Sequence, residues 1–173
     1  MKKILSVILT PVYLLFFALL LVIFHPVQVV TRWIWGYPVR KKVVDILNFG
    51  LLYSLWILGT RIIFRGFEQI PQNRPLIIVA NHQSLLDIVA IVVGFRKYHP
   101  KFISKAELGR GIPSVSYNLR HGGSVLIDRK KGAQSVKDIM MLGKHIEATG
   151  YSACIFPEGT RTKNGLVKTF QPA

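Results

Sequence analysis

The 173-residue chain is poor in cysteine and in acidic residues. Its one cysteine, Cys154, excludes an intramolecular disulfide and any zinc site that needs several cysteines. Eight Asp and Glu residues stand against 23 Lys and Arg, so the net charge is +15. A soluble domain of this length usually has a balanced surface, so we expect a partner with negative charge. Nucleic acid, anionic lipid and an acidic substrate would each meet that expectation.

The chain also lacks internal repeats and low-complexity stretches, and half of its residues are apolar, which excludes general disorder. An uncharged run of 21 residues extends from Ile4 to Phe24. As a helix it would be about 31 Å long, which matches a hydrocarbon core of about 30 Å. Lys2 and Lys3 precede the run, as in a secretory signal, but it is longer than a signal core and no cleavage site of small residues follows. We therefore predict a retained membrane anchor.

A second apolar segment covers residues 43–60, with Asp45 near its start. A carboxylate at the centre of a bilayer is costly, so we expect either a shallow or interfacial helix or the second arm of a helical hairpin. Residues 1–60 are thus predicted to form a membrane-associated segment of two helices. The linker between them is rich in groups that favour the headgroup layer: Trp33, Trp35, Tyr37, Arg40, Lys41 and Lys42.

Residues 61–173 carry a net charge of +10 and consist of short alternating elements. This alternation indicates an α/β sheet with crossovers, in which functional sites lie beyond the carboxyl ends of the strands. The continuous apolar run at 76–80 favours a strand that is buried on both faces. The predicted strands are 61–67, 76–80, 101–104, 124–128 and 153–156, and the predicted helices are 84–94 and 133–149.

The loop after the strand at 76–80 contains His82 and Asp87. A neutral imidazole, with a reference pKa of about 6.5, can accept a proton, and a carboxylate on its other nitrogen would orient it. At a spacing of five, the two side chains can meet only if His82 precedes the helix. The alternative is structural, because Ser84 and Asp87 fit the S-x-x-D pattern of a capped helix start. The two roles are compatible.

The loop after the strand at 153–156 runs from Pro157 to Arg161. Gly159 would let the backbone approach a ligand closely, and Arg161 offers a fork of donors that suits phosphate. A polar turn after a strand is the simpler alternative. The segments 122–123 and 128–131 are candidates for a third side of the same anion-binding site. Their structural alternatives are a hairpin turn and a solvated basic face, respectively.

Two residues are candidates for the nucleophile of a covalent mechanism, Ser84 and Cys154. Ser84 is better explained as a helix cap, and Cys154 as a small buried residue of an apolar strand. We therefore favour direct transfer over covalent catalysis.

Three motifs in this order resemble those of the glycerolipid acyltransferase family. They are Asn-His-x-Ser-x-x-Asp at 81–87, Gly-x-Val-Leu-Ile-Asp-Arg at 123–129 and Phe-Pro-Glu-Gly-Thr-Arg at 156–161, and the stretch 105–108 also matches. The resemblance covers residues 61–173 and implies a mixed sheet flanked by helices. The family usually continues with another apolar strand, so we expect this acyltransferase domain to be truncated at its C-terminus.

The resemblance implies transfer of a fatty acyl group to the free hydroxyl of 1-acyl-glycerol-3-phosphate, which gives phosphatidic acid in phospholipid biosynthesis. Acyl-CoA or acyl-carrier protein would be the donor substrate, with no cofactor and no metal. His82 would be the general base and Asp87 its orienter. The phosphate would be bound by Gly159, Thr160 and Arg161, assisted by Arg129 and Lys105, while Glu158 of the same loop shapes it.

The expected partners are a membrane lysophospholipid and the acyl donor, at the cytoplasmic face of a bacterial inner membrane. Another acceptor, such as glycerol-3-phosphate or a different lysophospholipid, is an alternative, and so is a non-catalytic, membrane-bound anion-binding protein. Nucleic acid is not expected as a partner, because no basic-aromatic RNA motif or DNA-reading module is present.

Overall fold

A computed structural model describes residues 2–128, 132–162 and 164–170. The chain divides into two compact units, residues 1–70 and 71–173. The boundary that we predicted after residue 60 falls inside the first unit, ten residues before the observed division.

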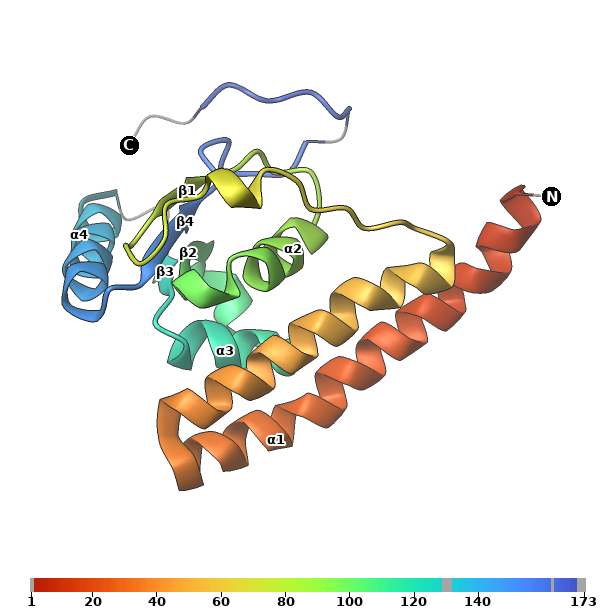
Figure 1. Cartoon of the computed structure of the whole chain (residues 1–173), viewed down its shortest axis with the longest axis horizontal. Helices are drawn as coiled ribbons and strands as arrows, with labels where there is room; N and C mark the ends of the chain where they lie inside the picture. Colours follow the sequence, from red (N-terminus) through yellow and green to blue (C-terminus); the bar gives the residue numbers. More distant parts are fainter. Residues whose placement is uncertain (1, 129–131, 163, 171–173) are drawn as a thin grey trace. The chain divides into compact units, whose positions relative to one another are not determined.

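The first unit is dominated by one long helical element, α1 (Lys2–Tyr53), which breaks at Gly36. Gly36 has φ 73° and ψ −159°, a conformation that side-chain-bearing residues rarely adopt. Here the chain reverses direction, and two helical arms run side by side (Figure 1). Pro38 lies in the first turn after the break, where a missing N–H costs no helical hydrogen bond.

The two arms pack through a close approach at Gly50, where an added Cβ would lie 3.2 Å from Leu20. Tyr13 of the first arm also hydrogen-bonds Ser54, which follows the second arm. The second apolar segment is therefore the second arm of a hairpin, and Asp45 within it pairs with Lys41 one turn earlier. By length and composition the element is able to cross a membrane. The expected linker is itself helical except at Gly36.

The second unit contains a four-stranded sheet in the order β1-β4-β2-β3 (Figure 1). All three pairings are parallel, and β4 lies between β1 and β2. The predicted α/β sheet flanked by helices is confirmed, but the described strands pair only in parallel, whereas the resemblance implied a mixed sheet. The strands are β1 (Ile77–Val79), β2 (Pro100–Lys105), β3 (Val125–Ile127) and β4 (Ser152–Ile155).

Two strand predictions were wrong in part or in whole. Residues 61–66 form no strand, and a 3₁₀ helix follows at Phe67–Gln69, because Gly66 has φ 77° and no strand pairs with this segment. The strand at 76–80 is not buried on both faces. It lies at the edge of the sheet, so Ile78 is buried while Ile77 and Val79 are 77% and 58% exposed.

Three helices accompany the sheet: α2 (Leu86–Gly94), α3 (Val115–His121) and α4 (Gly132–Thr149). The sequence predicted α2 and α4 but not the seven-residue α3, which is too short to show a helical period. Further 3₁₀ turns lie at Ser54–Leu58, Arg96–Tyr98 and Ala106–Gly109.

The core of the unit lies between α2 and one face of the sheet. Ile78, Phe102 and Cys154 come from the three adjacent strands β1, β2 and β4, and apolar residues of α2 pack against them. Successive strand residues point to opposite faces, so Lys101 points away from α2, and its side chain lies near His145 of α4 around Gly123. The helices α2 and α4 therefore cover opposite faces (Figure 1).

Cys154 provides a test of this packing. Its side chain is 1% exposed, and burial raises the pKa of the thiol to about 12. We expect a maleimide reagent at pH 8 to leave the folded chain unlabelled and to label it fully in denaturant, as followed by mass spectrometry. Rapid labelling of the native chain would contradict the described core.

Candidate active site

The two predicted loops both follow the carboxyl ends of their strands, and these ends lie together because β1 and β4 are parallel neighbours. Val79 pairs with Ile155 in the last register position, and the N–H of Ala80 donates to the Ile155 carbonyl just beyond it. The segments that contain His82 and Glu158 therefore begin side by side, although these residues are 76 positions apart.

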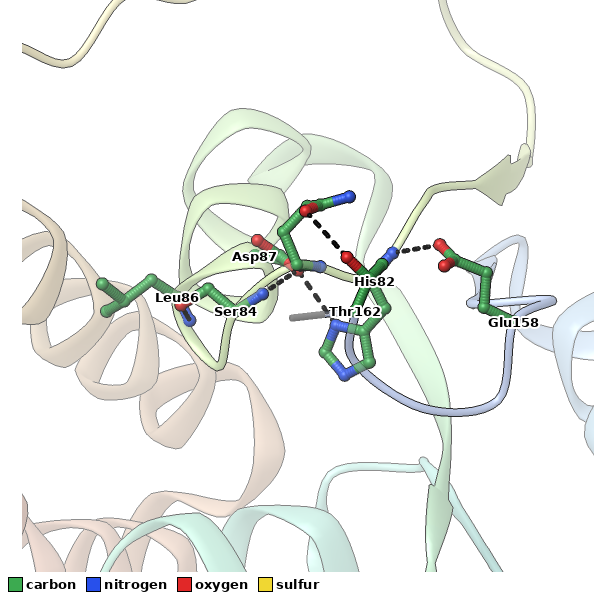
Figure 2. A network of polar contacts seen from close by, with 7 residues as sticks. His82, Ser84, Leu86, Asp87, Glu158 and Thr162 are labelled. Carbon is green, nitrogen blue, oxygen red and sulfur yellow. Dashed lines mark hydrogen bonds and ion pairs between the residues drawn. The ribbon is translucent and has the colours of Figure 1, made fainter. Parts of the chain in front are cut away.

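His82 and Asp87 meet as the sequence predicted. Nδ1 of His82 lies 2.9 Å from Oδ2 of Asp87 (Figure 2). The contact forms because α2 begins only at Leu86, so His82 lies in the turn before the helix. A carboxylate can only accept, so Nδ1 carries the hydrogen and Nε2 is left as the acceptor. Figure 2 shows Nε2 on the side of the ring away from Asp87.

Asp87 also organises the start of α2. Its Oδ2 accepts the main-chain N–H groups of Gln83, at 2.7 Å, and Ser84, at 2.8 Å. In return, Oγ of Ser84 accepts the N–H of Leu86 at 3.2 Å. The bond from the Ser84 N–H to Asp87 is one half of the S-x-x-D capping pattern that the sequence offered as the alternative, whereas the Ser84 hydroxyl accepts from Leu86 and not from Asp87. The same carboxylate thus caps the helix start and orients the His82 ring.

The His82 ring is further held by Phe156, the residue after β4. The two rings stack with centroids 4.2 Å apart and planes 23° apart. The His82 side chain is 15% exposed, so part of the ring remains accessible to a ligand. A base held on one face by an aromatic ring and at Nδ1 by a carboxylate has little rotational freedom, which suits proton transfer in a fixed direction.

Glu158 is the most enclosed residue of the second loop, at 1% exposed. Its Oε1 accepts the N–H of His82 at 2.7 Å, and its Oε2 accepts the N–H of Lys168 at 2.8 Å (Figure 2 shows the first bond). The bond from Lys168 and then the bond from His82 lower the pKa of this carboxyl, so it stays ionised near neutral pH. A buried anion of this kind shapes the loop, as the sequence predicted, and is unsuited to contact a phosphate.

Four of the five residues predicted to bind the phosphate lie within the described part of the chain. Gly159 has φ 65°, and its N–H closes a turn onto the Phe156 carbonyl at 2.9 Å. Thr160 and Arg161 follow in this loop with exposed side chains. Lys105 is exposed at the carboxyl end of β2, while Arg129 lies outside the described residues.

Thr162 is a site residue that the sequence did not suggest. Its N–H donates to the carbonyl of His82 at 2.8 Å, and its side chain is 6% exposed. Its Oγ1 lies 3.4 Å from Oε1 of Gln83 and accepts the N–H of Gly165 at 3.2 Å. No local pattern marks this role, because it depends on a contact between two loops that are far apart in sequence.

Comparison with known proteins identifies the family of the chain. A family model described as Acyltransferase matches residues 61–173, which include both loops. The chain belongs to the acyltransferase family. The resemblance identified from the three motifs is therefore confirmed at the level of the family.

Individual relatives of the chain bear consistent names. The chain is 33% identical over 122 residues to a 1-acyl-sn-glycerol-3-phosphate acyltransferase of Borreliella burgdorferi, covering 68% of this chain and 46% of the relative. It is 27% identical over 128 residues to the alpha enzyme of that name from Ovis aries, covering 74% of this chain and 44% of the relative. The chain thus spans less than half the length of these relatives.

A solved structure extends the similarity to the whole chain. The crystal structure of the 1-acyl-sn-glycerophosphate acyltransferase PlsC from Thermotoga maritima matches with a TM-score of 0.77 and 27% identity. The match covers 99% of this chain and 68% of that chain, so it includes the helical hairpin as well as the sheet.

Ser84 can be tested as a cap against its alternative as a nucleophile. We expect Ser84→Ala to lower the free energy of unfolding by about 1 kcal/mol, because the Leu86 N–H loses its partner. Denaturant unfolding in detergent measures this change. Acyl transfer should remain measurable in the variant, and its total loss with an intact fold would favour a covalent role for Ser84.

Proposed function

We propose that this acyltransferase moves a fatty acyl group from acyl-CoA or acyl-carrier protein to the free hydroxyl of 1-acyl-glycerol-3-phosphate, which yields phosphatidic acid. The observation that carries the proposal is the His82–Asp87 pair, held beside a loop with an exposed arginine at one edge of the sheet. The names of the relatives support the same substrate class.

In this mechanism Nε2 of His82 removes the proton from the acceptor hydroxyl as its oxygen attacks the thioester carbonyl. Asp87 keeps the required tautomer and stabilises the imidazolium that forms. When the tetrahedral intermediate collapses, the carbon–sulfur bond breaks and the imidazolium returns its proton to the thiolate. The acyl group passes directly between the substrates, so neither Ser84 nor Cys154 is required as a nucleophile.

Acceptor recognition in this proposal rests on the loop Gly159–Arg161. The guanidinium of Arg161 is exposed and can offer two parallel donors to a phosphate. Lys105 at the end of β2 adds positive charge near the same edge, and Arg129 is proposed to assist. A phosphate bound here would fix the acceptor relative to the base, since both loops leave adjacent strands.

We also propose that the protein works at a membrane, at the cytoplasmic face of a bacterial inner membrane. The exposed apolar side chains of α1 suit a lipid environment, and the net charge of +10 on residues 61–173 suits an anionic surface. A lysophospholipid acceptor resides in that layer, so the hairpin would bring the site to its substrate.

The role of His82 separates an enzyme from a non-catalytic anion-binding protein. We expect His82→Ala to lower the rate of acyl transfer at least about 100-fold, because no base remains for the hydroxyl proton. Binding to vesicles that contain the lysophospholipid should persist. The measurement is transfer of labelled acyl-CoA in membranes, and a wild-type rate in the variant would refute the base assignment.

Arg161 tests the nature of the acceptor. Arg161→Ala should raise the KM for 1-acyl-glycerol-3-phosphate by about tenfold or more, the loss expected for a charge-assisted hydrogen bond. Arg96→Ala is the matched control. This exposed arginine lies just before the amino end of β2, whereas the proposed phosphate site lies beyond the carboxyl ends of the strands. A panel of acceptors completes the test, and a preference for a neutral acceptor without phosphate would contradict the role of Arg161.

A further inference from the structure

The buried carboxylate of Glu158 joins two segments that are otherwise separate. One oxygen accepts the N–H of His82 at 2.7 Å and the other accepts the N–H of Lys168 at 2.8 Å. His82 belongs to the loop after β1, and Lys168 to the segment after the phosphate loop. Glu158 is thus a bridge between the main chain of the base and the segment 164–168.

The burial of Glu158 makes this bridge specific. A carboxylate that is 1% exposed is costly unless hydrogen bonds replace its hydration. The two main-chain donors supply that replacement, and bonds to an ionised acceptor are stronger than neutral ones. The positions of the two N–H groups are therefore constrained by the same anion.

The carbonyl and the ring of His82 are also held by residues next to Glu158. Its carbonyl accepts the N–H of Thr162 at 2.8 Å, and its ring stacks on Phe156. Residues 156–162 therefore contact the N–H, the carbonyl and the ring of the base. Asp87 determines which way Nδ1 points, but the location of the whole residue depends on the second loop.

Lys168 adds a connection to the proposed phosphate site. Its Nζ donates to the carbonyl of Arg161 at 3.0 Å, while its N–H donates to Glu158. The same residue therefore contacts the main chain of the anion-binding arginine and the carboxylate that holds the base. A shift of the segment 164–168 would therefore move both the main chain of Arg161 and the carboxylate of Glu158.

We propose that Glu158 is a positioning residue: it fixes the main chain of His82 and couples it to the segment 164–168, and it does not bind the acceptor. This inference rests on the proposed function, in which His82 is the base. A displacement of about 1 Å at a reacting group can reduce the rate about 100-fold, so loss of the bridge should affect turnover more than acceptor binding.

The first experiment measures the bridge without using activity. Amide hydrogen exchange is compared in wild type and Glu158→Gln, a variant that leaves an NH₂ group facing one of the two N–H donors. We expect at least one of the two amides, His82 or Lys168, to exchange at least about tenfold faster in the variant, because the single oxygen of the Gln side chain cannot accept from both. Glu147→Gln is the matched control, because Glu147 is exposed in α4, and it should leave both amides unchanged. Unchanged exchange at both His82 and Lys168 in Glu158→Gln would overturn the proposal.

The second experiment separates positioning from binding by kinetics. For Glu158→Gln we expect kcat to fall at least about tenfold, while KM for the lysophospholipid changes less than about threefold. Glu158→Asp, which keeps the charge but is one methylene shorter, should also lower kcat, because it cannot reach both donors. Protection of Cys154 from labelling shows in each case that the core is intact. A raised KM with an unchanged kcat would make Glu158 a binding residue and overturn the inference.

The two proposals fail in different ways. If His82→Ala keeps the wild-type rate, the proposed function fails, and the exchange experiment still reports on the bridge. If His82→Ala is inactive while Glu158→Gln retains both kcat and the protection of the His82 and Lys168 amides, the proposed function stands and the positioning role is wrong.

Discussion

The parallel pairing of β1 with β4 is the constraint on which the site depends. It joins strands from distant parts of the sequence and places β4 between β1 and β2. Because the carboxyl ends of neighbouring parallel strands lie on the same side of the sheet, the loop with His82 and the loop with Glu158 begin next to each other. The hydrogen bonds and the ring stacking between these loops are possible only because of that register.

The site then uses its few acidic residues at points where each satisfies several donors. Oδ2 of Asp87 has three partners, namely Nδ1 of His82 and the main-chain N–H groups of Gln83 and Ser84. Glu158 uses one oxygen for each of two N–H groups. Both carboxylates therefore hold the scaffold, while the exposed charges of the site are cations. A site whose carboxylates are occupied by main-chain and ring N–H donors, and whose cations are exposed, suits an anionic substrate.

The sequence predicts the structure correctly where the relevant residues are close together in the chain. The spacing of His82 and Asp87 required the base to precede the helix, and α2 does begin at Leu86. Segment 61–67 was misassigned because an apolar run alone does not say whether a partner strand exists. Likewise, the run at 76–80 did not reveal that β1 lies at the edge of the sheet. Thr162 and the bonds of Glu158 could not be predicted, because they join residues many positions apart and depend on strand order.

Asp87 contacts both the His82 ring and the main chain at the start of α2. For this reason the sequence pattern at 81–87 could not distinguish a capping role from a catalytic one. A capping carboxylate must lie over the first turn of the helix and accept main-chain N–H groups there. Once it is fixed in that place, a histidine just before the helix is within reach, and its Nδ1 becomes one more donor to the same oxygen. The orientation of the His82 ring therefore costs little additional ordering, because the helix start has already fixed the carboxylate. Spacing alone predicts this geometry, whereas the location of the base relative to the anion-binding loop requires the second strand.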